Sequence, residues 1–514
     1  MGTATSLDLI VIGVYLLVVT AVGCWMSGHT RTAAEFMSAG GRLPGWVVGL
    51  SVIGTFVSSI SFIANPGKTY AGNWNAFVFS LTLPYAAWVA TKYFVPFFRT
   101  CGSLSAYEHL EHRFGLWARL YAAAFNVMYH VSRIGTILYG VSLAVSALID
   151  VDLYVIIAAL GILVIVYTLL GGIEAVIWTD VLQSIILVGG MLVCAWVLIA
   201  ETPGGIFGIL ETASRGPGNK LSLGSLAFDF SGSTFWTVAA FGFVINLQNF
   251  AADQTYVQRY FTARSEADAA RSVWIGALAY VPISAILFFT GTALFVFYQN
   301  SQTLPEGIKP DAVLPHFIIN ELPSGLSGLL IAAILAAAMS TVDSSLNSSV
   351  TLLLCDIRPW FLSGKATTSA AGAAARDRSD LRFLRWMTVI LGCAGIGVAC
   401  AMTRVQGLLD AWWMISGILS GGTLGLILLA RFTNATGAFG AAAGVICGVT
   451  CIGLITLAHL TDLPELFQPL ATSLHPVKKL LHPTMAIVVG TIAVLCVGAA
   501  LSQRRTGSRH EGGS

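Results

Sequence analysis

Long apolar stretches separated by short polar segments run through the whole chain. A membrane-spanning helix needs about 20 mostly apolar residues, and thirteen stretches have this character. They cover residues 7–26, 46–70, 75–98, 116–148, 153–170, 173–199, 234–256, 270–298, 325–354, 381–402, 408–429, 437–459 and 482–501. These runs are too long and too continuous for the alternating strands of a barrel. The pattern predicts an all-α integral membrane protein with about 13 transmembrane helices.

Composition supports a single membrane-embedded unit over residues 1–514. Hydrophobic residues make up 56% of the chain and charged residues only 10%, whereas a soluble protein carries about 25% charge. Most of the surface must therefore face the lipid bilayer. The net charge of +2 is too small to suggest binding to nucleic acid. A transporter, a channel and an intramembrane enzyme remain open at this point.

Basic residues predict the orientation, because cytoplasmic loops are enriched in Lys and Arg. With the N-terminus outside, eighteen of the 27 Lys and Arg residues fall inside, seven outside and two within the spans. We expect a multi-pass protein of the inner (plasma) membrane with a cytoplasmic C-terminus. Residues 7–26 lack a basic leader and a cleavage site, so we interpret them as a helix and not a signal peptide. Residues 502–514 are predicted to be a disordered tail.

A polar stripe interrupts the apolar stretch 325–354. Counted from Ser340, the residues at helical offsets of 3, 4, 7 and 8 share one face, and they are Asp343, Ser344, Asn347 and Ser348. A single serine in a membrane helix commonly bonds to its own backbone. A whole face of hydroxyls with one carboxylate instead favours a site for a hard cation.

The stretch 46–70 is broken by small and polar residues. Gly54, Ser58, Ser59 and Ser61 interrupt it, followed by Asn65-Pro66-Gly67. A break of this kind frees backbone carbonyls, which hold a cation where they line a cavity. A plain proline kink beside a tight packing face is the alternative.

Two further ionisable groups lie at membrane depth, where such groups are costly. Asp180 follows the tight connection Gly171-Gly172, and it is either functional or a buried structural acid. Arg133 stands near the middle of a span and needs an anion. Asp180, Asp343 and a substrate carboxylate are all open as that partner.

The segment 245–265 ends a span in polar residues. We interpret it as a cytoplasmic helix end, with Arg259 and Arg264 at the lipid head groups. The sequence has no nucleophile elbow, no nucleotide-binding loop and no metalloprotease motif. We therefore expect no enzymatic activity, and transport driven by an ion gradient.

Three ordered motifs, GGIEAVIWTDVLQ, DQTYVQRY and MSTVDSSLNSSVT, resemble those of the sodium:solute symporter family over roughly residues 6–500. The resemblance implies a LeuT-type fold of two inverted repeats with five helices each. The first repeat would cover residues 46–199 and the second 234–429. An extra N-terminal helix (7–26) and two C-terminal helices (437–501) would complete the fold.

The resemblance also implies sodium ligands. The main sodium site would consist of the carbonyls of Gly54, Val57 and Ala337 and the hydroxyls of Ser340 and Thr341. A second sodium site, found in some members, would use Asp180, Ser340, Asp343 and Ser344. The family usually has a hydroxyl residue where Asp343 stands, so this acid could strengthen the second sodium site, pair with Arg133 or bind a proton.

Within the family, the stretch SVIGTFVSSISFIANPGKTYAGNW is most similar to bacterial sialic acid transporters. That similarity implies that Arg133 binds the substrate carboxylate and that Ser58 and Ser61 line the site, with Phe56 and Ser80 as further wall residues. We expect a monomeric, sodium-coupled symporter that imports a carboxylated sugar such as sialic acid by alternating access. A neutral sugar, a monocarboxylate or an amino acid is the alternative cargo. A passive channel or facilitator is the alternative class.

Overall fold

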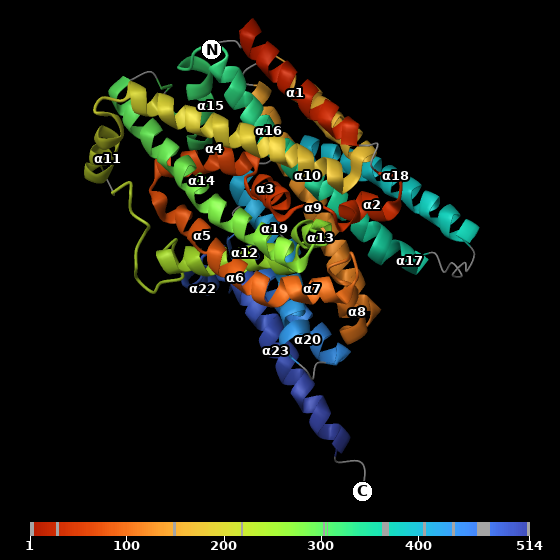
Figure 1. Ribbon diagram of the computed structural model, residues 1–514. Helices are drawn as coiled ribbons and strands as arrows, with labels where there is room; N and C mark the ends of the chain where they lie inside the picture. Colours follow the sequence, from red (N-terminus) through yellow and green to blue (C-terminus); the bar gives the residue numbers. More distant parts are fainter. Residues whose placement is uncertain are drawn as a thin grey trace.

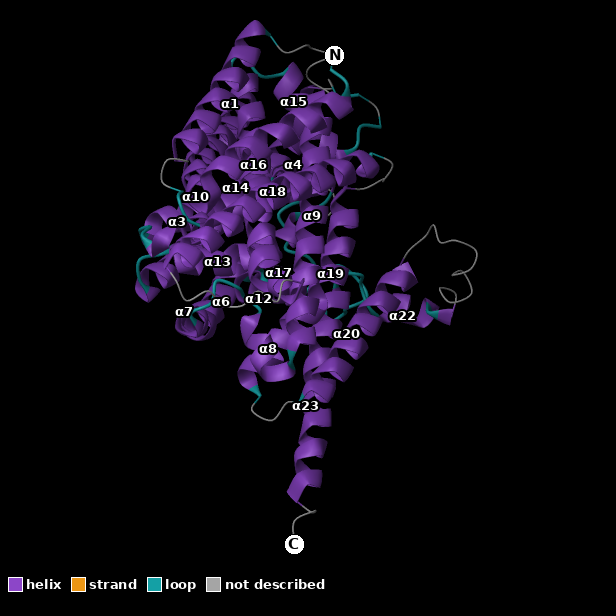
Figure 2. Ribbon diagram, turned by 90° about the vertical axis from the view of Figure 1, so that its right-hand side faces the viewer, coloured by secondary structure: helices purple, strands orange, loops and turns teal. Residues whose placement is uncertain are grey.

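Helices make up nearly all of the regular structure in the computed structural model (Figure 2). The model describes residues 5–510 except 27–29, 147–150, 217–218, 302–303, 306, 362–369, 404–407, 434–436 and 460–472. Within these residues the single β-type contact is an isolated bridge between Leu43 and Ala263. The prediction of an all-α protein is confirmed for the described part of the chain.

The long helices follow the apolar stretches of the sequence (Figure 1). They are α1 (Ser6–Met26), α9 (Leu116–Ser146), α10 (Leu153–Glu201), α12 (Phe235–Ala252), α14 (Glu266–Ser301), α16 (Leu326–Leu352), α18 (Ala370–Met402), α19 (Leu408–Phe432), α20 (Ala438–His459) and α23 (Met485–His510). Shorter helices connect them: α2 (Ala33–Ser38), α8 (Glu108–Phe114), α11 (Gly205–Arg215), α13 (Gln254–Thr262), α15 (Pro310–Asn320), α17 (Arg358–Phe361) and α22 (His475–Leu480).

Two predicted spans are broken, and one pair of spans is joined. The stretch 46–70 forms α3 (Gly45–Phe56) and α4 (Ser59–Ala71), which are bent by 56° against each other. The stretch 75–98 forms α5 (Val78–Leu81), α6 (Leu83–Val89), a π-helical turn (Ala90–Phe94) and α7 (Val95–Cys101). Residues 153–199 form one element, α10, which turns sharply at Gly172 with φ 60°. The predicted tight connection at Gly171-Gly172 is confirmed.

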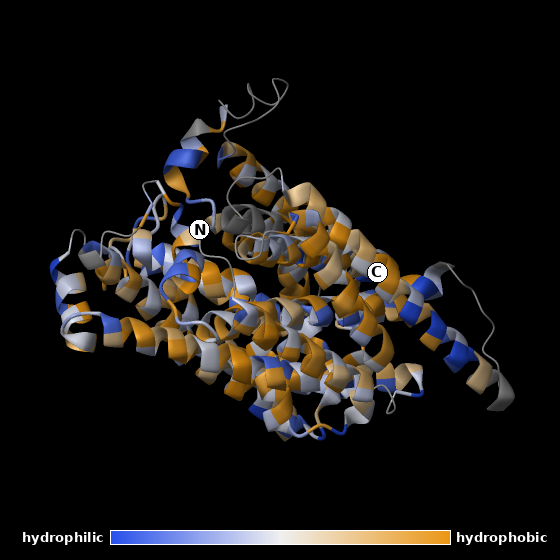
Figure 3. Cartoon of the chain, turned by 90° about the horizontal axis from the view of Figure 1, so that it is seen from above, coloured by the Kyte–Doolittle hydropathy of each residue, from blue (hydrophilic) through white to orange (hydrophobic). Residues whose placement is uncertain are grey.

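Seven of the described helices are individually long and apolar enough to cross a membrane, or eight if α3 and α4 count as one span. This number is lower than thirteen for physical reasons. The element α10 covers two predicted spans, and the stretch 75–98 is divided into short pieces. The apolar parts of α19 and α23 (Ser416–Phe432 and Met485–Leu501) are shorter than 18 residues, and α9 is not among the seven. Figure 3 shows hydrophobic residues along most helices and hydrophilic residues mainly near helix ends and loops. Thirteen crossings remain a prediction.

Helix α16 lies at the centre of the molecule. In its most apolar stretch 89% of the residues are buried, against 22% for α1 and 28% for α18. It packs against α1, α9, α10 and α18 and also against the broken pair α3 and α4. The polar stripe predicted from the sequence therefore faces protein and not lipid.

A carboxylate joins α1 to the start of α16. Asp8 Oδ1 accepts hydrogen bonds from the backbone N–H of Gly325 at 2.7 Å and of Gly328 at 2.8 Å. The first N–H groups of a helix have no partner within the helix, and an acid there is favoured by the helix dipole. Asp8 thus caps α16 from a segment more than 300 residues away.

The C-terminal helix is longer than predicted. Helix α23 continues to His510, beyond the predicted span 482–501, and the disordered tail over residues 502–514 stays a prediction. Gln503, Arg504 and Arg505 are good helix formers, which lets the helix continue past its apolar part. Residues 511–514 lie outside the described residues. Figures 1 and 2 show the start of α1 and the end of α23 at opposite ends of the molecule.

Candidate functional site

The break between α3 and α4 redirects backbone hydrogen bonds. In a continuous helix the N–H of Ser58 would bond to the carbonyl of Gly54, but here it bonds to Phe56 O at 3.2 Å. The N–H of Ser61, which would bond to Val57 O, instead donates to Ser58 Oγ at 3.3 Å. The carbonyls of Gly54 and Val57 are therefore released from helical bonding, which makes them available to a cation.

The end of α3 packs closely against the polar stripe of α16. A Cβ atom added to Gly54 would lie 2.7 Å from Ser340 Oγ and 2.9 Å from Ser184 Oγ, so only glycine allows this close approach. One turn of α16 supplies the other oxygens, and Thr341 Oγ1 bonds to Ala337 O at 2.9 Å. The five residues predicted for the main sodium site thus come from two elements in contact.

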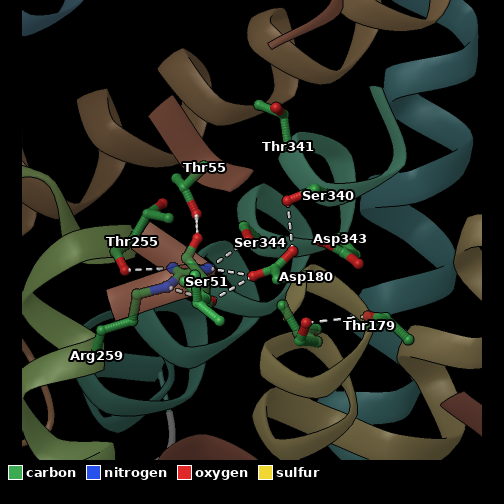
Figure 4. A network of polar contacts seen from close by, with 12 residues as sticks. Ser51, Thr55, Thr179, Asp180, Thr255, Arg259, Ser340, Thr341, Asp343 and Ser344 are labelled. Carbon is green, nitrogen blue, oxygen red and sulfur yellow. Dashed lines mark hydrogen bonds and ion pairs between the residues drawn. The ribbon is translucent and has the colours of Figure 1, made fainter. Parts of the chain in front are cut away.

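Asp180, on α10, is the centre of a polar network (Figure 4). Its Oδ1 accepts from Ser340 Oγ at 2.5 Å, and its Oδ2 accepts from Ser51 Oγ at 2.5 Å and from Arg259 Nη2 at 2.9 Å. The same Nη2 donates to Ser344 Oγ at 2.7 Å. Asp180, Ser340 and Ser344, three of the four residues predicted for the second sodium site, therefore lie together. The group that joins them is the guanidinium of Arg259 and not an ion.

The interpretation of Arg259 as a head-group anchor is wrong. Its side chain is fully buried, and it also donates to Ser51 Oγ at 2.9 Å and to Thr255 O at 2.8 Å. The chain breaks at Asp253 and re-enters the core as α13, so its polar residues face inward. A buried guanidinium needs an acid, and Asp180 is that acid. Arg264, in contrast, is exposed and donates to Arg42 O.

The hydrogen-bond partners of Asp343 differ from those of Asp180. Its Oδ2 accepts from the hydroxyl of Tyr167 at 2.8 Å. Its Oδ1 is buried, with no hydrogen-bond partner among the described residues. The structure therefore joins Asp343 to neither Asp180 nor Arg133.

Arg133 lies on the other side of the α3–α4 break. Its Nη2 donates to the carbonyl of Thr55 at 3.0 Å, next to Gly54. Asp180 is bonded to Arg259, and Asp343 to Tyr167, so neither acid is the partner that the sequence left open. The buried acid Asp253 also interacts electrostatically with Arg133, so a substrate carboxylate as the partner of Arg133 stays a prediction.

A cavity of about 1030 Å³ borders Arg133. All five predicted substrate residues line it: Phe56, Ser58, Ser61, Ser80 and Arg133. Aromatic rings form much of the wall, since the ring of Phe56 lies 4.8 Å from that of Tyr256 and 5.5 Å from that of Tyr280. Small-molecule sites are typically clefts of about 300–1,000 Å³ with few polar groups, so the cavity has room for a small organic solute.

Sequence reasoning missed several residues of this wall. Tyr129, Asn249, Tyr256 and Tyr280 line the cavity. Tyrosines in apolar stretches give no signal of their own, because they are ordinary core residues of membrane helices. For Tyr256 a signal existed, since it follows the polar break at Asp253.

The break at Asp253, between α12 and α13, is held by a buried pair of side chains. Asp253 caps α13 by accepting from Thr255 N at 2.8 Å, and its Oδ1 lies 3.1 Å from Nε2 of His130 on α9. His130 stands one helical turn before Arg133. This contact fixes α13, with Tyr256 and Arg259, against the helix that carries Arg133.

The C-terminal end of α4 is held by a loop lysine. Lys220 Nζ donates to Tyr70 O at 2.6 Å and lies 3.9 Å from the ring centroid of Phe295. Burial lowers the pKa of this ammonium group. The loop residues Gly224, Ser225 and Ser233 continue the rim of the cavity.

Comparisons with known proteins agree with this geometry. The chain is 31% identical to the sodium/sialic acid symporter NanT of Aliivibrio fischeri, covering 96% of this chain and 92% of that one. It is 33% identical to the sodium/sialic acid symporter SiaT of Proteus mirabilis, with 88% and 90% covered. Human sodium-coupled monocarboxylate transporter 1 is 28% identical, with 87% and 72% covered.

Comparison with solved structures also finds sodium-coupled symporters. The fold matches a Na+-coupled sialic acid symporter in a substrate-bound outward-open state, with a TM-score of 0.86, 29% identity, and 97% and 98% of the two chains covered. A nucleobase-cation-symport-1 family transporter shares the fold with a TM-score of 0.51. The model of the sodium:solute symporter family matches residues 36–448. As the three sequence motifs predict, the chain belongs to the sodium:solute symporter family.

Proposed function

We propose that this protein imports a carboxylated sugar such as sialic acid, as a monomer, by sodium-driven alternating access. The observation that carries the proposal is the position of Arg133 in one cavity with Ser58 and Ser61. Ser58 is the N-cap of α4, and the N-terminus of a helix favours an anion. A guanidinium binds a carboxylate in bidentate geometry. Two independent features of the site thus favour a carboxylate.

The break also supports coupling between sodium and solute. The main sodium site would use the carbonyls of Gly54 and Val57, and between them Thr55 O accepts from Arg133. Sodium would fix the broken segment against α16 and thereby place Arg133 and Ser58 for the solute. Such coupling is reciprocal, so the solute raises the affinity for sodium by the same factor. One sodium ion that enters with a carboxylate moves no net charge, so only its concentration gradient drives that step. A second sodium ion would add the membrane potential, about 2.3 kcal/mol per 100 mV, or about fortyfold in accumulation.

The proposal includes the finer architecture. We infer thirteen crossings with the N-terminus outside, in two inverted repeats over 46–199 and 234–429. The opposite positions of α1 and the end of α23 agree with an odd number of crossings (Figure 1). The second sodium site, with Asp180, Ser340, Asp343 and Ser344, would need Arg259 to release Asp180 and Ser344.

Uptake into proteoliposomes tests the proposal. Radiolabelled sialic acid should accumulate above equilibrium when sodium is high outside, and lactate, glucose and an amino acid serve as competitors. Arg133→Ala should weaken the apparent affinity for sialic acid by a factor of about 30 or more, since loss of a buried charge partner costs about 2–5 kcal/mol. Thr136→Val on the same helix is the control, because Thr136 bonds only to Ser132 O and does not line the cavity.

The outcomes separate the alternatives. Uptake that ignores sodium would exclude symport, and equilibration without accumulation would indicate a channel or facilitator. Sodium-driven uptake of radiolabelled lactate without uptake of radiolabelled sialic acid would assign a monocarboxylate as cargo. An unchanged sialic acid affinity in Arg133→Ala would remove the proposed role of Arg133.

A further inference from the structure

Two arginines at one end of the molecule have buried nitrogen atoms without a hydrogen-bond partner. They are Arg113 on α8 and Arg431 in the last turn of α19. The Nε and Nη2 atoms of Arg113 and the Nε atom of Arg431 are shielded from solvent, and none of them bonds to another group in the described part of the chain. A buried guanidinium N–H without an acceptor is costly, so these nitrogens point to an anionic ligand.

An aromatic ring on α7 lies between the elements that carry the two arginines. The guanidinium carbon of Arg431 lies 5.7 Å from the ring centroid of Phe97, and the ring of His109, on α8, lies 4.9 Å from the same centroid. Arg113 follows His109 by four residues, which places both on one face of α8, and its charge acts on His109. Helix α8 also contacts α19 and α20 directly. The two arginines therefore border one junction of α7, α8 and α19.

The acids of α8 already have a different cation as partner. Glu108 and Glu111 lie 3.9 Å and 2.7 Å from the guanidinium nitrogens of Arg119, which also pairs with Asp356. Burial lowers the pKa of His109 to about 4, so this ring is neutral near pH 7. The charge at the junction is thus that of the two arginines, and no ion pair between described residues neutralises it.

The junction lies where lipid head groups are expected. Figures 1 and 2 show α7 and α8 toward the end of the molecule from which α23 projects, and the basic residues predict this end to be cytoplasmic. Phe432, next to Arg431, is 52% exposed, and Leu116, three residues after Arg113, is 39% exposed. Apolar side chains that face outward beside arginines are typical of a membrane interface, where they meet acyl chains while the arginines meet head groups.

We propose that Arg113 and Arg431 bind the phosphate of an anionic phospholipid of the inner leaflet. A guanidinium group binds phosphate in bidentate geometry, and basic pockets between transmembrane helices on the cytoplasmic side bind anionic head groups. The acyl chains then lie against Phe432 and Leu116. The lipid site is independent of the proposed solute site, because none of these four residues lines the central cavity.

Native mass spectrometry of the purified protein with added lipids tests the lipid site. Phosphatidylglycerol should be retained more than phosphatidylethanolamine, which has the same phosphate but no net charge. Arg113→Gln and Arg431→Gln should each lower the retained phosphatidylglycerol about fivefold. The double variant should lose less than the product of the two single losses, because both arginines act on one head group. Arg382→Gln is the matched control, since Arg382 is an exposed arginine of α18 that donates to Arg378 O.

The change in Tm on adding lipid gives a readout that needs no variant. In detergent, phosphatidylglycerol should raise the Tm of the unaltered protein more than phosphatidylethanolamine does, and inorganic phosphate at the same concentration should not. Arg431→Lys, which keeps the charge and loses the fork, should retain part of this rise.

Three results would overturn the lipid site. Equal effects of the two lipids on the unaltered protein would exclude selection by charge, and a rise in Tm with inorganic phosphate as large as with phosphatidylglycerol would assign a free anion instead of a lipid. Retention that Arg382→Gln lowers as much as Arg431→Gln, or losses that multiply fully in the double variant, would exclude a shared site at Arg113 and Arg431. Sodium-driven uptake decides on the proposed function separately, because the lipid site does not rest on it.

Discussion

The predicted main sodium site and the Asp180 region meet on the same face of α16, and they are built in different ways. The predicted main sodium site would offer neutral oxygens, namely the carbonyls of Gly54 and Val57 freed by the helix break and the α16 groups near Ser340. The neighbouring region contains a full negative charge on Asp180, which is already bonded to Arg259. Ser340 belongs to both, since its hydroxyl donates to Asp180.

The difference suits two tasks in a membrane protein: one site that binds and releases an ion, and one ion pair that stays formed. Neutral oxygen atoms tolerate both the presence and the absence of an ion, because no buried net charge is left behind. A buried carboxylate that stays ionised requires a counter-charge at all times. A tethered arginine supplies that charge without leaving, so we expect the main sodium site to bind and release sodium while the Asp180 region holds the helices together.

Removal of the arginine should have the largest effect. Arg259→Gln leaves Asp180 buried without a cation and should lower the free energy of unfolding by about 3–5 kcal/mol. Thermal unfolding in detergent should show a clearly lower Tm, and Arg264→Gln, on an exposed side chain, is the control. A sodium-dependent rise in Tm should be larger in Arg259→Gln than in the unaltered protein, because sodium can then reach Asp180. An unchanged Tm would contradict the ion-pair assignment.

Loss of the Ser340 and Thr341 hydroxyls should have the second-largest effect. Ser340→Ala combined with Thr341→Ala should reduce sodium-driven uptake about a hundredfold, equivalent to about 2.8 kcal/mol, with a smaller loss of stability than in Arg259→Gln. Ser349→Ala is the control, because Ser349 lies on the same helix and bonds only to Ser345 O. Sodium dependence that persists in the double variant would exclude this position for the main sodium site.

The smallest effect should come from the contact of Asp343. Tyr167→Phe removes the one hydrogen bond that the described structure gives this carboxyl group and should cost about 1–2 kcal/mol in stability. Tyr85→Phe, at an exposed tyrosine, is the control. The sodium concentration for half-maximal uptake should stay the same in Tyr167→Phe. A several-fold change in that sodium concentration would indicate that Asp343 is a ligand of the second sodium site.

The residues found from the sequence share one property. Arg133, Asp180 and the α16 stripe interrupt long apolar stretches, and polar groups there are too costly to be incidental. The break at Gly54 to Ser61 was visible for the same reason, because small and polar residues replace apolar ones.

The residues that sequence reasoning missed do not stand out from their neighbours in polarity. Arg259 stands in a polar run that resembles a cytoplasmic helix end, and only the turn at Asp253 brings it into the core. Tyr256 and Tyr280 are aromatic residues of a kind that membrane helices bury everywhere. The pairing of Arg259 with Asp180 joins positions 79 residues apart, which no local pattern can show.

The contact of Asp8 with the start of α16 has a consequence for biosynthesis. The two partners are separated by 317 residues, and ribosomes add about 5–20 residues per second, so α1 waits roughly 15–65 s for its neighbour. During that time the Asp8 carboxylate has to remain near the water at the membrane surface. Helix α1 also packs against α10, which is made earlier, so only its Asp8 end is fixed late, and substitutions at Asp8 should act mainly on the yield of inserted protein.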